Sequence, residues 1–223
     1  MKLWIGAALG GALALGGCQT ASTVGPMGGA ITMNAREASL SGGQAGTQVS
    51  VRSPDPTKWV SRRVGNMMIW ACRPLACADA RTGVGVAITR ASTRNPDPEA
   101  LRKLAKILPA QTNAQNAVLE IASDGQEKVE SLSSRVTTLR GYPAITTETK
   151  RSGRGKPAFD ATAYVFVGLA QVRISSVSLD RQVSKRHLDD FVAAMQIDDR
   201  PPGAPAEEPA AEASATAAPA PAS

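Results

Sequence analysis

Aromatic residues and histidine are the scarcest groups in this sequence: Phe, Trp and Tyr make up 4% of the 223 residues, and His187 is the single histidine. Few aromatics argue against a carbohydrate-stacking groove and against a platform of interleaved aromatics for nucleic acid. With one histidine, the sequence offers too few ligands for a typical zinc site. It also offers a single candidate for the histidine base that nucleophilic catalysis usually uses. We expect His187 to be a surface or interface residue and expect no metal or cofactor.

Motifs of common enzyme classes are also missing. The sequence has no GxSxG elbow, and Gly83–Val86 lacks the third glycine of a dinucleotide fingerprint, so it is more simply a turn that enters a strand. The side chains of the adjacent acidic residues Asp189 and Asp190 would point in different directions on a helix, so they would not converge as an acid/base pair. We therefore expect a non-enzymatic protein; the alternative is an enzyme whose site the sequence does not reveal.

The first residues have the order of a secretory signal peptide. Lys2 is followed by an uncharged run from Leu3 to Cys18, in which small residues precede the cysteine. The segment Leu15-Gly16-Gly17-Cys18 resembles the lipobox of bacterial lipoproteins. The resemblance implies that residues 1–17 are removed, that Cys18 carries the lipid, and that the protein faces the periplasm. Gln19 stands where an aspartate would resemble the inner-membrane retention signal, so the outer membrane is favoured. The alternative is an ordinary signal peptide cut nearby, with Cys18 a free thiol.

Composition divides the mature chain into three parts. Residues 18–48 are rich in Gly, Ser, Thr and Ala. They predict a flexible tether whose end-to-end distance is roughly 30 Å. Residues 200–223 are rich in Ala and Pro and predict a disordered tail that is either inert or reaches a partner or peptidoglycan. Residues 49–199 carry the periodic patterns of one globular domain.

The patterns within 49–199 predict an α+β domain, with an antiparallel sheet covered by helices. A helix starts at Asp97-Pro98, and Pro109 is expected to break or kink it before a second apolar face of Ala114, Ala117, Val118 and Ile121. A last helix over Val183–Gln196 has an apolar stripe. Strands are expected at Gly65–Ala71, Val84–Thr89, Ser134–Leu139, Ala144–Lys150, Ala161–Val167 and Ala170–Leu179.

Part of this domain resembles a known family. The segment Gly141-Tyr142-Pro143, the hairpin FDATAYVFVGLAQVRISSVSLD and the closing HLDDFVAAMQI are similar to the C-terminal half of PsbP-like domains. The resemblance implies an antiparallel sheet covered by helices, and a binding or assembly accessory rather than an enzyme. No binding residue can be matched position by position.

Cys72 and Cys77 form an even pair once Cys18 is set aside. In an oxidising compartment such a pair favours a disulfide. An extended chain would place their Cα atoms roughly 16 Å apart, against ~5.5 Å in a disulfide, so the chain must turn, and Pro74 suits the second position of a β-turn. Free thiols, or metal or redox chemistry, are the alternatives.

Charge gives the last functional hint. The net charge of +6 suits solubility, or contact with anionic envelope polymers or lipid headgroups, rather than nucleic acid. The segment Lys150-Arg151-Ser152-Gly153-Arg154-Gly155-Lys156 is a basic loop that offers four cations to a phosphate or carboxylate. The alternative is an ordinary solvated hairpin loop. We thus expect a lipid-anchored binding or assembly accessory; a polyanion-binding module that uses Lys150, Arg151, Arg154 and Lys156 is the rival.

Overall fold

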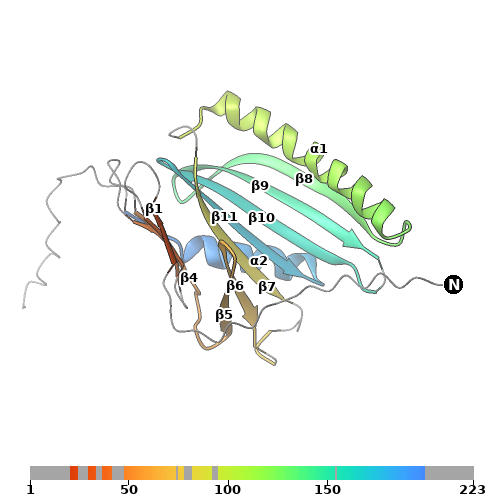
Figure 1. Cartoon of the computed structure of the whole chain (residues 1–223), viewed down its shortest axis with the longest axis horizontal. Helices are drawn as coiled ribbons and strands as arrows, with labels where there is room; N and C mark the ends of the chain where they lie inside the picture. The colour runs from red at the N-terminus through yellow and green to blue at the C-terminus, as the bar shows by residue number, and fades with distance from the viewer. Residues whose placement is uncertain are drawn as a thin grey trace, which may run out of the picture.

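Two antiparallel sheets and two helices are formed by the residues that the computed structural model describes, which are 21–24, 30–33, 37–41, 48–73, 75–77, 82–91, 95–153 and 155–198 (Figure 1). The predicted α+β class is confirmed. The signal peptide, Cys18 and the tail 200–223 lie outside the described residues.

The larger sheet has seven strands, and each pairs antiparallel with its neighbours. In spatial order they are β5 (Trp59–Val64), β6 (Met67–Cys72), β7 (Gly83–Arg90), β11 (Ala170–Ser178), β10 (Ala158–Val167), β9 (Tyr142–Ser152) and β8 (Lys128–Leu139). Six of these were predicted from alternating or apolar runs, with ends that differ by a few residues. Strand β5 was missed because Arg62 and Arg63 interrupt its apolar pattern.

Alternation along β10 divides the large sheet into two faces. Ala163 and Val165 are fully buried on one side, which we call the core face, while Thr162 and Tyr164 point to the other side, which we call the groove face. Helix α2 (Arg181–Ala193) packs on the core face, where Phe191 lies 5.3 Å from Trp70 between ring centroids. The predicted apolar stripe of this helix is confirmed, since Leu188, Phe191, Val192 and Met195 are buried.

The smaller sheet has the order β1 (Ala21–Val24), β2 (Ala30–Met33), β3 (Glu37–Ser41), β4 (Gln48–Arg52) and β12 (Gln196–Asp198). Ala38, Val49 and Val51 extend the core that α2 covers. Part of the range predicted to be a flexible tether, 18–48, therefore forms strands. Composition misled the prediction, because Ala38 is small yet fully buried, and its strand pairs with β2 and β4.

Helix α1 (Pro98–Ala122) starts where the sequence predicts, because Asp97 caps its first turn. Oδ1 of Asp97 accepts hydrogen bonds of 2.8 Å from the amides of Glu99 and Ala100. The first half of the helix packs Leu101 and Ala105 on the groove face. The predicted break at Pro109 is wrong, since one helix of 25 residues runs through it.

The second half of α1 shows the other difference from prediction. Ala114, Ala117, Val118 and Ile121 do not form a separate helix, and their side chains face the solvent rather than the sheet. Val118 is 68% exposed and Ile121 is 80% exposed. The inner side of this half carries Thr112, Asn116 and Leu119 instead.

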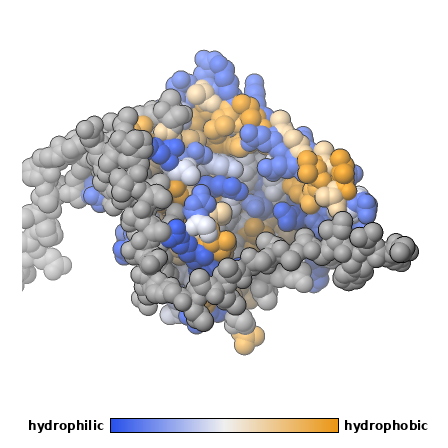
Figure 2. All heavy atoms as spheres, viewed as in Figure 1, coloured by the Kyte–Doolittle hydropathy of each residue, from blue (hydrophilic) through white to orange (hydrophobic). Residues whose placement is uncertain are grey.

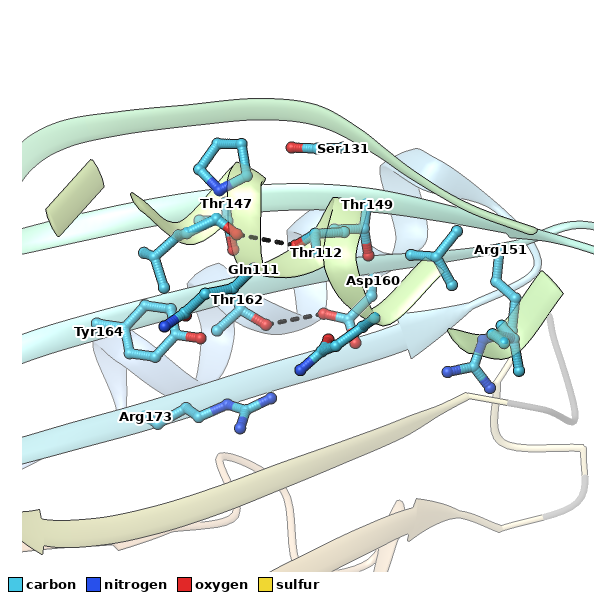
Figure 3. Close-up of a pocket in the computed structure, with 15 residues that line it drawn as sticks. Gln111, Thr112, Ser131, Thr147, Thr149, Arg151, Asp160, Thr162, Tyr164 and Arg173 are labelled. Atoms are coloured by element: carbon cyan, nitrogen blue, oxygen red, sulfur yellow. Dashed lines mark hydrogen bonds between the residues drawn. The ribbon is translucent and has the colours of Figure 1, made fainter. Parts of the chain in front are cut away.

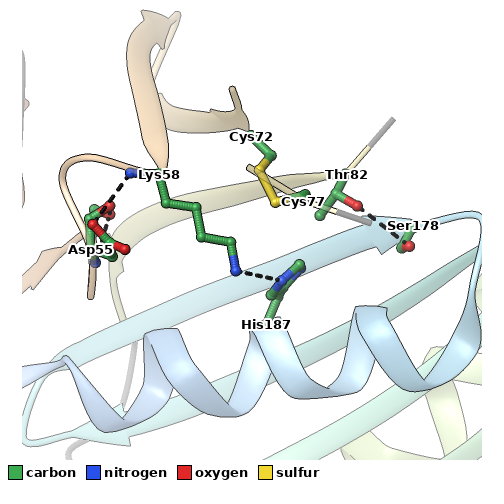
Figure 4. Close-up of a disulfide and its surroundings, with 8 residues drawn as sticks. Asp55, Lys58, Cys72, Cys77, Thr82, Ser178 and His187 are labelled. Atoms are coloured by element: carbon green, nitrogen blue, oxygen red, sulfur yellow. Dashed lines mark hydrogen bonds between the residues drawn. A yellow bond between two sulfur atoms is a disulfide. The ribbon is translucent and has the colours of Figure 1, made fainter. Parts of the chain in front are cut away.

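The disulfide between Cys72 and Cys77 is confirmed, with the two Cα atoms 6.1 Å apart (Figure 4). The amide of Ala76 donates a hydrogen bond of 3.1 Å to the carbonyl of Arg73. This is the i to i+3 bond of a β-turn. Pro74 itself lies outside the described residues. Within the described ranges, no helix has the length and apolar character needed to cross a membrane.

Candidate functional site

A groove of about 470 Å³ lies between the second half of α1 and the groove face of the large sheet (Figure 3). The groove exists because the inner side of α1 becomes polar after Leu108, so the helix no longer packs tightly on the strands. Its walls are mostly hydroxyl and amide side chains: Gln111, Thr112, Gln115, Ser131, Thr147, Thr149, Thr162 and Tyr164. Its charged lining residues are Arg151, Asp160 and Arg173.

Hydrogen bonds on β10 and β11 organise the floor of the groove. The hydroxyl of Thr162 lies 2.8 Å from Oδ1 of Asp160 and 2.8 Å from the hydroxyl of Ser175, which is its partner across the strands. Nε of Arg173 donates to the same Ser175 hydroxyl at 3.2 Å. The chain of contacts thus links a carboxylate to a guanidinium through two hydroxyls.

Arg173 is also held by an aromatic ring. Tyr164 is its partner across the strands, and the guanidinium carbon lies 5.8 Å from the ring centroid. This is the geometry of a cation–π contact. Because Nε is used by Ser175, the two terminal nitrogens of the guanidinium are the donors that a bidentate ligand could meet. Figure 3 shows Arg151 and Tyr164 toward opposite ends of the groove.

The carboxyl group of Asp160 is not an ordinary surface acid. Burial raises its pKa above the usual value, although the hydrogen bond from Thr162 and the charges of Arg173 and Arg151 oppose that shift. The charged set of the groove is therefore two guanidinium groups and one carboxyl group whose pKa is raised by burial. Such a set favours an anionic ligand with hydroxyl or amide groups.

A second hollow of about 470 Å³ adjoins the groove and shares Asp160 and Arg173 with it. It lies over β6, β7 and β11, and its floor includes Met67, Ile69 and Gly85. A Cβ atom at Gly85 would lie 3.0 Å from Cε of Met67, so glycine at this position leaves room for the Met67 side chain in the floor of the hollow. Arg173 thus stands between a polar groove and a more apolar one.

The predicted basic loop is divided by the sheet. Lys150 and Arg151 are consecutive residues of β9 and point to opposite faces, so only Arg151 reaches the groove. Lys156 is exposed beyond the end of β9, and Arg154 lies outside the described residues. Arg151 lines the same groove as Arg173, a residue that was not predicted from the sequence, but toward its other end.

The expectation of a surface histidine is wrong. His187 is 4% exposed on α2, on the core face, where its ring lies edge-on to Trp59 with centroids 5.0 Å apart. Its Nε2 lies 3.4 Å from Nζ of Lys58 (Figure 4). Burial lowers its pKa, and the charge of Lys58 lowers it further. The sheet separates this residue from the groove.

Sequence reasoning also missed a buried carboxylate on the core face. Glu148 on β9 is 7% exposed, and its oxygens lie 2.8 Å from Arg181, 3.5 Å from Lys185 and 3.7 Å from Arg135. Within the described part of the chain, no group of three or more His, Cys, Asp and Glu residues could hold a metal ion. The ion pairs of Glu148 connect β9 with β8 and α2.

Sequence comparisons with known proteins give no match, either to a protein family model or to a curated protein. Solved structures give weak matches of fold. Cyanobacterial PsbP from Synechocystis is 11% identical over 74% of this chain and 95% of that one, with a TM-score of 0.47. LpqN of Mycobacterium tuberculosis, a protein involved in cell envelope biogenesis, is 14% identical over 73% of this chain and 90% of that one, with a TM-score of 0.44.

A protein of Bacteroides thetaiotaomicron is 9% identical over 67% of this chain, with a TM-score of 0.44, and the match spans 45% of its length. At these identities and TM-scores, no ligand, partner or activity of those proteins is carried over to this chain.

Proposed function

We propose that this protein is a lipid-anchored envelope protein that acts as a non-enzymatic binding or assembly accessory, and that it binds an anionic ligand in the groove beneath α1. The observation that carries the proposal is Arg173, whose guanidinium is oriented by Ser175 and Tyr164 at the floor of a hydroxyl-lined groove. A carboxylate or phosphate group that meets Arg173 would find hydroxyl and amide donors on both walls.

The groove is suited to holding a ligand more than to transforming one. Its titratable side chains are Arg151, Asp160, Tyr164 and Arg173. Asp160 is engaged by Thr162, and the histidine of the chain lies on the other face of the sheet. We favour binding over catalysis because Asp160 already accepts a hydrogen bond from Thr162 and Tyr164 packs against Arg173, so neither is placed as a free general acid or base.

The ligand-binding part of the proposal is tested by retention on two anionic surfaces, purified peptidoglycan and vesicles that contain phosphatidylglycerol. Replacing Arg173 by Gln removes one charge-assisted contact, so affinity should fall by about tenfold or more on the surface that supplies the ligand group. The matched control is Arg62→Gln, which removes one exposed charge on β5 away from the groove. Equal retention of both variants on both surfaces would contradict the groove as the binding site.

The rival site in the basic loop is tested in the same experiment. The double variant Lys150→Gln/Lys156→Gln removes two loop cations that do not line the groove. Retention lost in that variant, but kept in Arg173→Gln, would place the anion on the loop.

The anchor is tested separately, so that either half of the proposal can fail alone. The intact mass of the protein purified from membranes should exceed that of the peptide chain from Cys18 by its acyl groups, because two or more chains are needed for stable anchoring. The Cys18→Ser variant should leave the membrane fraction. A Cys18→Ser protein that still partitions with outer membranes would contradict the anchor.

A further inference from the structure

The outer face of α1 carries an apolar stripe that is not used in the fold. Ile107 is 48% exposed, Val118 is 68% exposed and Ile121 is 80% exposed. The exposed alanines Ala110, Ala114 and Ala117 fill the spaces between them at helical spacing. Figure 2 shows apolar atoms gathered over the second half of α1.

We propose that this stripe is a self-association surface, on which α1 of a second copy of this chain lies antiparallel about a two-fold axis at Ala114. In that arrangement Ile107 meets Ile121 of the second copy, and Ala110 meets Val118 of the second copy. The stripe is self-complementary in size, since small alanines at its centre allow the helices to approach closely.

The distribution of charged residues along α1 favours a second copy as the occupant of the stripe, and it favours the antiparallel direction. The basic residues Arg102, Lys103 and Lys106 outnumber the one acidic residue Glu99 near the start of α1, and the acidic Glu120 lies in its last turn. Lys106 and Glu120 flank the same edge of the stripe, about 12 Å and about 9 Å from Ala114 along the helix axis. Antiparallel pairing therefore places Lys106 beside Glu120 of the second copy, twice in each dimer, whereas parallel pairing places residues of like charge at the same level.

The same charge pattern disfavours an anionic membrane as the occupant. A bilayer surface would attract the basic start of α1 and repel its acidic end, so the stripe would not lie flat on it. One helix pair buries less area than the ~1,200–2,000 Å² of a stable interface, so the dimer should be weak in dilute solution. Anchoring both copies to one membrane, as proposed above, would raise their effective concentration.

The test uses cysteine cross-linking of the full chain in the cells that produce it. Ala114→Cys places a thiol on the two-fold axis and should give a disulfide-linked dimer on a non-reducing gel. Ile107→Cys alone should stay monomeric, and Ile107→Cys/Ile121→Cys should cross-link. The matched control is Gln115→Cys, one residue away from Ala114 and lining the groove. Dimers of Ile107→Cys alone would contradict the antiparallel direction.

Variants of the stripe and its flanking charges complete the test. Val118→Asp, in the Ala114→Cys chain, should lower the cross-linked fraction by about tenfold, because it places a charge in the apolar contact. Lys106→Glu should lower the cross-linked fraction, and Lys106→Glu/Glu120→Lys should restore it. Thermal unfolding would show that each variant folds. The proposal is overturned if Ala114→Cys gives only monomer. If Val118→Asp then also releases the Cys18→Ser chain from phosphatidylglycerol vesicles, the stripe binds a membrane instead of a second copy.

Discussion

The hydroxyl of Ser134 donates a 2.7 Å hydrogen bond to the main-chain carbonyl of Ala105. This carbonyl lies four residues before Pro109, which has no N–H to bond it within the helix. A side chain from β8 thus supplies the hydrogen bond that proline removes from α1. This contact explains how a helix of 25 residues continues through a proline that would otherwise end it.

Replacing Ser134 by Ala should therefore lower the free energy of unfolding by about 1–2 kcal/mol, because a partly buried carbonyl loses its donor. In a Pro109→Ala background the residue at 109 has its own N–H, and the same replacement should cost less. The difference between the two costs is the coupling energy of the pair, measured by urea unfolding of the four proteins. A coupling within about 0.3 kcal/mol of zero would mean that Ser134 does not compensate for Pro109.

The sequence was sufficient for elements whose cause is local. The Asp97 cap, the stripe of α2 and the alternating strands β9 to β11 follow from short patterns. Pro109 was misread because its compensation comes from Ser134, which is 29 positions from Ala105 in the chain and reaches α1 only after folding.

The groove, too, could be predicted from the sequence only in part. The pairing of Thr162 with Ser175 follows from the tight turn at Gly168, and the aspartate in the strand FDATAYVFV is a visible signal. That α1 covers this face only in part depends on how the helix packs, which no local pattern specifies. Arg173 therefore looked like an ordinary exposed strand residue.

Glu148 gives a prediction about charge in the core-face cluster. Burial raises its pKa, but the hydrogen bond from Arg181 and the charges of Lys185 and Arg181 outweigh burial and hold the pKa below its usual value. Glu148→Gln should lower the free energy of unfolding at neutral pH by about 1–3 kcal/mol, since charge-assisted hydrogen bonds are lost. The control Glu130→Gln, on an exposed site of β8, should change it little.

The sign of the pH dependence adds a second measurement on the same pair of variants. A carboxyl group with a depressed folded-state pKa stabilises the fold above its ordinary pKa of 4.5, and that contribution is lost as the pH falls through the folded value. The gap between wild type and Glu148→Gln should therefore narrow in acid. A gap that stays constant down to the acid transition would show that packing, not charge, accounts for the loss.

His187 predicts a separate acid sensitivity. Lys58 can only donate, so Nε2 of His187 accepts and the ring proton sits on Nδ1, a buried atom that has no hydrogen-bond partner among the described residues. The neutral ring is favoured in the fold, and its pKa is lowered from 6.5. In the unfolded chain the ring takes up a proton near that value, so folding stability should decline as the pH falls below about 6.5.

The variant His187→Phe keeps the aromatic contact with Trp59 and removes the titrating group. Its free energy of unfolding should change less than that of wild type between pH 7 and pH 5, as followed by urea unfolding. The companion variant Lys58→Met removes the opposing charge and should raise the pKa of His187 in the folded protein, which histidine NMR titration measures. Identical pH profiles of wild type and His187→Phe would rule out the buried ring as the source of acid sensitivity.

The disulfide supports the last prediction, which separates the cross-link from the packing of its cysteines. Cys72 is buried in the core and pairs across the strands with Trp59. Cys72→Ala would therefore open a cavity as well as break the bond. Reduction leaves both side chains in place and should lower the free energy of unfolding by about 2 kcal/mol, the chain-entropy estimate for so short a loop. The double variant Cys72→Ala/Cys77→Ala should lose more than reduction does, by the energy of the lost side-chain volume.

Urea unfolding with and without a thiol reductant measures both steps of this comparison. The unfolding of the double variant should not respond to the reductant, so that variant controls for any effect of the reductant on Cys18. Equal losses on reduction and on double substitution would mean that Cys72 contributes through its bond alone. The packing of the Cys72 side chain in the core would then have no part in holding β5 to β6.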